Sequence, residues 1–221
     1  LAAAGNALQK DLENVNPEAF SAALSDELAR RHDSFLTGLE AYRSHPFHRD
    51  MAEPPAIWES GPTRLLDYGA TSSVGKSGRP VLVVPSLVNR SYIMDLAEDH
   101  SFLRFLSSRG LRPLLIDWGI PGPNELGRSL SNYIAGDMAS ALDIAVGIAN
   151  DIPVPLIGYC MGGTLTAALA AISPGKISAL VLLAAPWDFH VGTDGPPVAV
   201  TAGRAGLEQL ISAEGCLSVD A

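Results

Sequence analysis

The sequence predicts an α/β fold built on a mainly parallel sheet. Short apolar runs alternate with helical patterns from residue 79 onward, and such alternation implies parallel strands joined by right-handed crossovers. The runs are continuous rather than alternating, as expected of strands buried on both faces. They cover residues 80–85, 114–116, 154–157 and 177–184. Since ligands of such sheets bind at the carboxyl ends of the strands, we expect the functional site there.

Residues 1–55 are expected to form an N-terminal helical extension. Asn16 followed by Pro17 and Glu18 marks a helix start, with proline in the first turn. One stripe, apolar apart from a single arginine, recurs at three- and four-residue steps. It consists of Leu24, Leu28, Arg31, Phe35, Leu39 and Tyr42. His45 and His48 end the pattern, and we expect solvated loop histidines because no cysteine or carboxylate cluster completes a metal site.

Residues 56–195 are expected to form the α/β core. It begins with a Pro-rich connector and an edge hairpin that includes residues 63–68. The loop of residues 71–78 contains Gly75-Lys76-Ser77, but the upstream glycine of a phosphate-binding loop is absent at the required spacing. The loop also precedes a strand where it should follow one. We therefore reject nucleotide binding at this loop.

Two helices are predicted between the first strands of the core. The first spans residues 97–109 and ends at Gly110 as its C-terminal cap. Its inward side chains are expected to be Phe102, Leu103, Phe105 and Leu106. The second spans residues 131–150, with a buried face of Ile134, Met138, Ala141, Leu142, Ala145 and Ile148. Residues 177–184 then form a further buried strand.

The stretch from Pro155 to Gly163 carries the chemistry. It has the G-x-S-x-G pattern of a nucleophile elbow, a strand–turn–helix with the nucleophile at its apex, but with Cys160 in place of serine. At Gly158 and Gly162 a Cβ would collide with the neighbouring strand or helix, and Gly163 lets the helix approach the sheet. A thiolate is a strong nucleophile. Taken alone, the five residues also fit a buried structural cysteine in a glycine-rich turn.

Composition narrows the function classes. The 221 residues are 47% hydrophobic and 18% charged, typical of a globular protein, and the net charge of −9 gives nucleic-acid binding no support. No run approaches the roughly 18 apolar residues that span a bilayer. The opening Leu1-Ala2-Ala3-Ala4 lacks the pattern of a signal peptide. Cys160 and Cys216 make no disulfide framework, which suits a reducing cytoplasm. Since the chain begins without Met, we expect a fragment.

Four stretches, in matching order over about residues 60–190, resemble the poly(3-hydroxyalkanoate) polymerases. The segment around Cys160 is similar to that family's cysteine-containing lipase-like box. A second stretch resembles the segment after its oxyanion strand, a third its Asp-Trp-Gly-x-Pro strand end, and a fourth the strand and turn after the elbow helix. In this sequence they are residues 158–163, residues 92–96 with Ser101-Phe102, residues 115–121 and residues 176–189.

The resemblance implies an α/β-hydrolase-type fold and a cysteine acyltransferase that needs no cofactor. Cys160 would take the acyl group of a 3-hydroxyacyl-CoA as a thioester, and the hydroxyl end of another unit would attack it, extending a polyester and releasing CoA. The oxyanion hole would combine the N–H of Met161 with one from the loop after Pro85. The candidates in that loop are Leu87 and Val88, together with Ser86 before them.

The resemblance also implies an acid and a histidine downstream of the nucleophile. His190 is the only histidine after Cys160, and the family does not use the residue of that turn as its base. Asp188 is expected to stabilise the turn and Asp117 to cap a loop, while His100 is expected on a helix surface. We therefore expect the acid and base beyond this chain, with residues 196–221, including Cys216, beginning a lid or cap segment.

Other functions stay open from the sequence. On the same fold, water could replace the hydroxyl acceptor, which would make the protein a cysteine-dependent esterase or polyester depolymerase. A non-catalytic relative could instead bind polyester granules or a full-length synthase. The resemblance further implies a homodimer, a growing polyester chain as partner and a cytoplasmic location at polyester inclusions.

Overall fold

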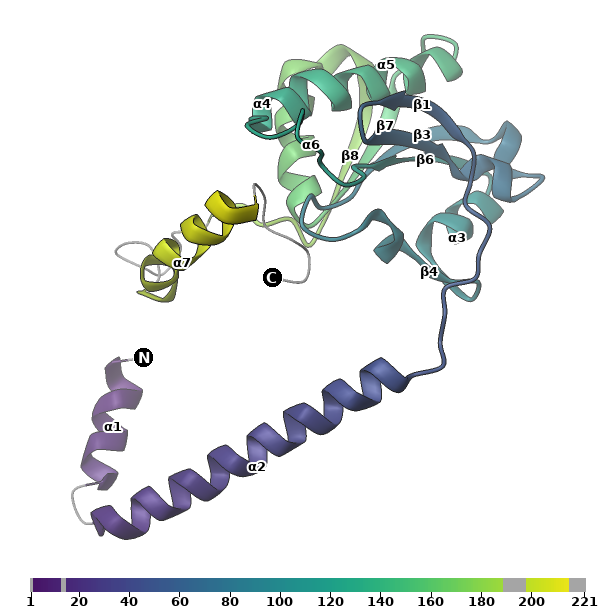
Figure 1. Ribbon diagram of the computed structural model, residues 1–221. Helices are drawn as coiled ribbons and strands as arrows, with labels where there is room; N and C mark the ends of the chain where they lie inside the picture. Colours follow the sequence, from purple (N-terminus) through teal and green to yellow (C-terminus); the bar gives the residue numbers. More distant parts are fainter. Residues whose placement is uncertain (1, 13–14, 189–197, 215–221) are drawn as a thin grey trace. The chain divides into compact units, whose positions relative to one another are not determined.

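A computed structural model of the protein describes residues 2–12, 15–188 and 198–214 (Figure 1). The chain divides into two compact units, Leu1–His48 and Arg49–Ala221. His190 and Cys216 lie outside the described residues. No helix in the described part is long and apolar enough to cross a membrane.

The first unit contains two helices, α1 (Ala2–Leu12) and α2 (Pro17–Ser44). The predicted start of α2 is confirmed, because the Asn16 side chain accepts hydrogen bonds from the backbone N–H groups of Glu18 and Ala19 at 2.9 and 3.0 Å. No residue of α2 is buried. Its apolar stripe is exposed, with Phe35 at 67% and Leu28 at 58%.

The second unit is organised around a six-stranded sheet in the order β1-β2-β6-β3-β7-β8. The strands are β1 (Ala56–Ser60), β2 (Thr63–Asp67), β3 (Arg79–Val84), β6 (Leu111–Asp117), β7 (Val154–Tyr159) and β8 (Ile177–Leu183). Strands β6, β3, β7 and β8 are parallel, while β1 and β2 form the predicted antiparallel hairpin. The predicted mainly parallel sheet is therefore confirmed.

Helices cover both faces of the sheet (Figure 1). One face packs against α6 (Met161–Ile172) and a continuous helical segment made of α4 (Leu130–Asn132), the π-helical turn η4 (Tyr133–Met138) and α5 (Ala139–Ile148). The other face packs against α3 (Phe102–Ser108). Because successive strand residues point to opposite faces, Leu82 and Val84 join the first core and Val81 and Val83 the second. The last helix, α7, spans Val198–Glu214.

The predicted helix of residues 97–109 is wrong in its first turn and in part of its buried face. A small hairpin, β4 (Asp95–Ala97) with β5 (His100–Ser101), occupies that turn. The helix begins at Phe102 because the Ser101 side chain caps it, accepting the Arg104 N–H at 3.0 Å. Leu103 is fully buried and Leu106 packs on the core, but Phe102 and Phe105 are 37% and 51% exposed. So short a helix buries only one narrow face.

The expectation that residues 177–184 are a buried strand is correct for the strand and wrong for its burial. Within the described part of the chain, β8 pairs only with β7 and ends the sheet. Leu180, Val181 and Leu182 are 38%, 42% and 45% exposed. An apolar run predicts that a strand can be buried on both faces, but whether it is buried depends on what packs beside it.

Three-residue and four-residue 3-10 turns complete the unit. They are η1 (Tyr68–Thr71), η2 (Gly75–Ser77), η3 (Ser91–Met94) and η5 (Pro174–Lys176). The turn η2, which contains Gly75-Lys76-Ser77, comes before strand β3. A phosphate-binding loop would follow a strand, so the structure agrees with the rejection of nucleotide binding at this loop.

Candidate active site

Cys160 occupies the sharp turn between β7 and α6. Its backbone has φ 53° and ψ −129°, a conformation that is strained for a residue with a side chain. Two backbone hydrogen bonds stabilise this conformation. The Cys160 N–H donates to the Leu183 carbonyl at 2.8 Å, and the Cys160 carbonyl accepts the Gly163 N–H at 2.8 Å. The thiol is free and only partly buried. The geometry is therefore that of a side chain presented at the carboxyl edge of the sheet.

Three glycines make this turn sterically possible. A Cβ on Gly158 would lie under 3.0 Å from Thr166 and Gly163 of α6. A Cβ on Gly162 would meet the carbonyl oxygens of Val84 and Pro85 just as closely, and one on Gly163 would lie 2.5 Å from the Ala185 Cβ. The helix therefore packs directly against the strand behind it and against the loop that leaves β3.

The two segments expected to supply oxyanion donors differ in whether their backbone N–H groups are already hydrogen-bonded. Met161 begins α6, and the described residues include no hydrogen-bond partner for its N–H or for that of Leu87. The Val88 N–H, in contrast, donates to the Ser86 hydroxyl at 3.1 Å. Of these two loop residues, only Leu87 therefore has a backbone N–H without a hydrogen-bond partner among the described residues.

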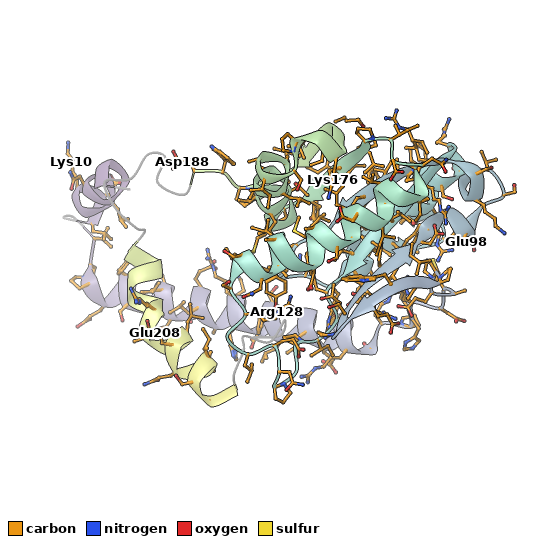
Figure 2. All side chains as sticks on the ribbon, turned by 90° about the horizontal axis from the view of Figure 1, so that it is seen from above. Lys10, Glu98, Arg128, Lys176, Asp188 and Glu208 are labelled. Atoms are coloured by element: carbon orange, nitrogen blue, oxygen red, sulfur yellow. The ribbon has the colours of Figure 1, made fainter. Side chains whose placement is uncertain are left out.

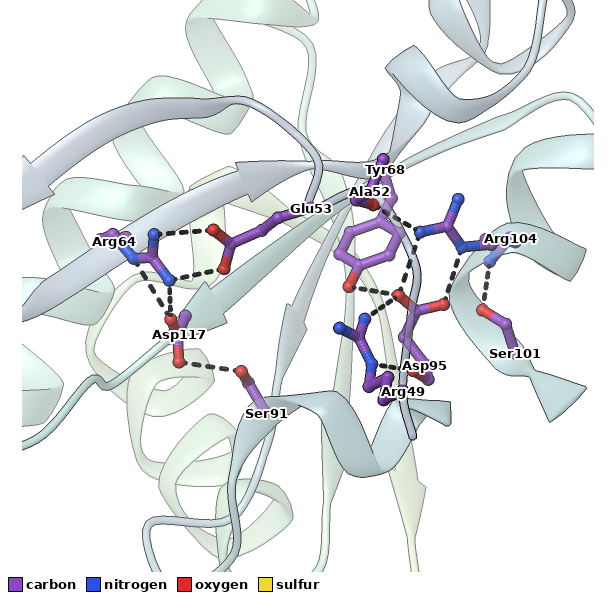
Figure 3. Close-up of polar contacts among 10 residues, drawn as sticks. All are labelled: Arg49, Ala52, Glu53, Arg64, Tyr68, Ser91, Asp95, Ser101, Arg104 and Asp117. Carbon is purple, nitrogen blue, oxygen red and sulfur yellow. Dashed lines mark hydrogen bonds and ion pairs between the residues drawn. The ribbon is translucent and has the colours of Figure 1, made fainter. Parts of the chain in front are cut away.

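The loop after β3 is anchored by the residues that end β6. The Trp118 indole N–H donates to the Pro85 carbonyl at 3.2 Å, and the indole is 8% exposed. Asp117 accepts hydrogen bonds from the Ser91 hydroxyl at 2.8 Å and from the Gly119 N–H at 3.4 Å, and forms an ion pair with Arg64 at 2.6 Å (Figure 3). The loop-capping role expected for Asp117 is thus confirmed.

A buried carboxylate that the sequence did not single out lies next to this region. The Asp95 side chain is fully buried and pairs with Arg49 at 2.7 Å and with Arg104 at 2.9 Å (Figure 3). The Tyr68 hydroxyl donates to the same carboxylate at 3.0 Å. Burial and the Asp95 charge raise the pKa of Tyr68, so its phenol remains the donor. The partners lie 46, 9 and 27 residues away in the chain, so no local pattern indicates them.

A cavity of about 350 Å³ lies at this carboxyl edge of the sheet. It is lined by three arginines, two carboxylates, and polar and apolar residues of β2, of the turn after β2, and of the loops after β3 and β6. The lining residues are Arg49, Glu53, Arg64, Leu66, Tyr68, Arg90, Ser91, Tyr92, Asp117, Gly119 and Ile120. Its volume is within the usual range for small-molecule sites.

The other candidate histidines within the described residues are exposed. His100 lies on β5, not on a helix, with a 75% exposed side chain 2.8 Å from Asp99. His45 and His48 are exposed, as expected. Asp188 follows β8 and is labelled in Figure 2. Among the described residues, no three His, Cys, Asp or Glu side chains gather as metal ligands do.

Comparison with family models gives two matches. Residues 79–203, more than half of the chain, match the model of the alpha/beta hydrolase fold. Residues 22–106 match that of the poly-beta-hydroxybutyrate polymerase (PhaC) N-terminus. The two matches overlap and together extend over most of the sequence.

Curated relatives agree with these matches. The chain is 38% identical over 111 residues to "Poly(3-hydroxyalkanoate) polymerase subunit PhaC" of Synechocystis sp., covering 50% of this chain and 29% of that protein. It is 30% identical over 199 residues to the protein of the same name from Haloarcula marismortui, covering 86% of this chain and 39% of that one. The chain thus spans well under half the length of these relatives. Among solved structures, an epoxide hydrolase from Vigna radiata aligns with 22% identity over 72% of this chain and 46% of its own, with a TM-score of 0.46.

Proposed function

Because the chain belongs to the α/β-hydrolase fold family and is a relative of the poly(3-hydroxyalkanoate) polymerases, we propose that Cys160 is the nucleophile of an acyltransferase. Its substrate is a 3-hydroxyacyl-CoA, and its product is a polyhydroxyalkanoate polyester with release of CoA. The observation that carries the proposal is a free, partly exposed cysteine at the strained apex between β7 and α6.

Cysteine suits this chemistry better than serine. The enzyme transfers an acyl group from one sulfur, that of CoA, to another, and then to a hydroxyl. Exchange between two thioesters is nearly isoenergetic, whereas a serine ester would be a more stable intermediate and slower to react. The turn also places Cys160 directly before the first residue of the twelve-residue helix α6.

The first half-reaction forms an acyl-enzyme. The Cys160 thiol gives its proton to a base, and the thiolate attacks the thioester carbonyl of the substrate. The N–H groups of Met161 and Leu87 donate to the oxygen that becomes negative in the tetrahedral intermediate. The bond between the carbonyl carbon and the CoA sulfur then breaks, and CoA leaves after taking up a proton.

The second half-reaction extends the polyester. The 3-hydroxyl end of another unit loses its proton to the base and attacks the Cys160 thioester. An ester bond forms, and the Cys160 thiolate is released for the next cycle. Water in place of this hydroxyl gives hydrolysis, so the choice of acceptor separates a polymerase from an esterase.

The proposal also includes the setting that the resemblance to the polymerases implies. The enzyme acts as a homodimer in the cytoplasm, at the surface of polyester granules. Residues 1–55 form its helical extension, residues 56–195 the α/β core, and residues 196–221 begin a lid or cap segment.

Mass spectrometry of the intact chain after incubation with 3-hydroxybutyryl-CoA tests the proposal. We expect a mass increase of one hydroxybutyryl unit that maps to Cys160, and no increase in Cys160→Ala. Oligomers growing on the protein indicate the polymerase, and free 3-hydroxybutyrate without oligomers indicates the esterase. An unmodified Cys160 in this chain, together with acylation of a longer protein that contains it, would place the base beyond residue 221. An unmodified Cys160 in both folded proteins would contradict the proposal and favour a granule-binding relative.

A further inference from the structure

The arginine-lined cavity lies close to the nucleophile. Asp117 ends β6, and Cys160 follows the end of β7. Only β3 lies between these two strands, with Leu82 level with both Leu114 of β6 and Leu156 of β7. Since neighbouring strands are about 4.8 Å apart, the ends of β6 and β7 are roughly 10 Å apart at the same edge of the sheet.

Two of the three arginines in the lining already have carboxylate partners. Arg49 pairs with Asp95 at 2.7 Å. Arg64 pairs with Glu53 at 2.7 Å and with Asp117 at 2.6 Å (Figure 3). Their charges are therefore compensated within the protein, and they form the wall of the cavity.

Arg90 differs from both. Its Nη1 donates to the Gly119 carbonyl at 3.3 Å, and no carboxylate within the described part of the chain pairs with it. This hydrogen bond holds one side of the guanidinium against the wall and leaves its other N–H donors available. In a chain with a net charge of −9, Arg90 supplies an uncompensated positive charge inside a cavity.

We propose that this cavity binds the phosphate groups of the CoA portion of the substrate, with Arg90 as the anchoring residue. The inference rests on the proposed function and adds a recognition site to it. A guanidinium presents paired N–H donors that match phosphate oxygens, and such charge-assisted hydrogen bonds are strong. In an acyl-CoA the phosphates lie at the far end of the pantetheine arm from the thioester. The arginine-lined cavity lies along the sheet edge from Cys160, so it can bind the phosphate end of the substrate while the thioester is at the cysteine.

Equilibrium binding of free CoA to the full chain tests the inference without requiring catalysis. Arg90→Gln is expected to weaken CoA binding by about tenfold or more, the loss of one charge-assisted hydrogen bond. The matched control is Arg79→Gln, which removes the same charge from an exposed arginine at the amino end of β3. It is expected to leave the affinity within about twofold. Equal effects of the two variants, or no CoA binding by the wild type, would overturn the inference.

Two further arms identify the ligand and separate the inference from the proposed function. Inorganic pyrophosphate at an equal concentration is expected to leave CoA bound, and equal competition would assign the cavity to free phosphates and refute a CoA site.

A 3-hydroxybutyryl thioester of pantetheine, which lacks the phosphates, is expected to acylate Cys160 equally well in wild type and Arg90→Gln. If Cys160 is never acylated but CoA binding depends on Arg90, the proposed function fails and the subsite stands. If Cys160 is acylated but Arg90→Gln binds CoA as tightly as the wild type, the proposed phosphate subsite is refuted.

Discussion

At the scale of single residues, the site combines a strained cysteine with glycines that leave room for it. A left-handed backbone conformation at a non-glycine residue costs of order 1–3 kcal/mol. At Cys160 this conformation is maintained by hydrogen bonds to Leu183 and Gly163, one on each side of the turn. The neighbouring glycines allow α6 to approach β3 and β7 closely enough for both bonds to form.

Gly162→Ala is expected to destabilise the protein and to impair acylation of Cys160. The new methyl group would meet two backbone carbonyl oxygens, of Val84 and Pro85, which cannot rotate aside as a side chain could. We expect the free energy of unfolding, measured by urea denaturation, to fall by about 1–3 kcal/mol. Displacement of the first helical turn would also move the Met161 N–H, so thioester formation should slow in the same variant.

Gly147→Ala is the matched control. Gly147 lies in α5, and a Cβ there would meet nothing within 4 Å. Because alanine is a better helix former than glycine, the free energy of unfolding is expected to stay equal or to rise by up to about 1 kcal/mol. Equal destabilisation by both variants would show that close packing at Gly162 is not the cause.

At the scale of elements, Asp95 joins segments that the sheet alone does not connect. Through Arg49, Tyr68 and Arg104 it ties the start of the second unit, the end of β2 and the helix α3 to β4. Burial by itself would raise the pKa of the Asp95 carboxyl. Hydrogen bonds from Arg104, Ser101 and Tyr68 outweigh burial and hold this pKa below its ordinary value.

This depressed pKa predicts the pH dependence of stability. A carboxyl whose pKa is lower in the folded than in the unfolded state stabilises the fold above its unfolded pKa, about 3.9. That contribution is lost as the pH falls through the lower, folded pKa. Asp95→Asn is therefore expected to lose about 2 kcal/mol or more at pH 7, because two arginines lose their partner. The difference from wild type should shrink as the pH falls below about 3.9.

Urea denaturation of both proteins at a series of pH values provides the measurement. The control is Asp99→Asn, which removes a carboxylate with an 80% exposed side chain from the turn of the same β4–β5 hairpin. Little change in stability is expected there at pH 7, since solvent screens an exposed pair. A constant difference between wild type and Asp95→Asn across the whole pH range would contradict the role given to the charge.

At the scale of the whole molecule, the second unit has a well-buried centre and an exposed rim. Strands β6 and β3 are covered on both faces and have neighbours on both sides. Strand β8 has β7 on one side, and the middle of its apolar run is exposed. Stability is therefore expected to be distributed unevenly over the sheet.

Hydrogen exchange followed by mass spectrometry checks this distribution. Amides of β3 and β6 are expected to exchange slowest, through global unfolding, and those of β8 measurably faster, through local opening. Peptides of β7 provide an internal reference, since that strand has neighbours on both sides. Protection of β8 equal to that of β3 would show that the rim is covered in solution.

The helix of residues 97–109 and the strand of residues 177–184 show where prediction from sequence succeeds and where it fails. Both elements exist, but the helix is shorter and its phenylalanines are exposed, and the strand lies at an edge. Apolar periodicity reports which face an element could bury. Whether that face is covered depends on neighbours that are distant in the sequence, and a local pattern contains no information about them.

Local sequence patterns are enough to predict the strand–helix alternation, the elbow around Cys160 with its glycines, and the start of α2 at Asn16. These features arise from interactions within a few residues of each other. Long-range packing sets the other features. Among the described residues, the N–H of Val88 has a hydrogen-bond partner and that of Leu87 has none, Asp95 is buried between two arginines, and Arg90 lines a cavity without a carboxylate partner. The Asp95 ion pairs and the cavity bring together side chains from distant parts of the chain, and the loop after β3 takes its shape where it packs against Trp118. Such arrangements exist only once the strands have assembled into a sheet.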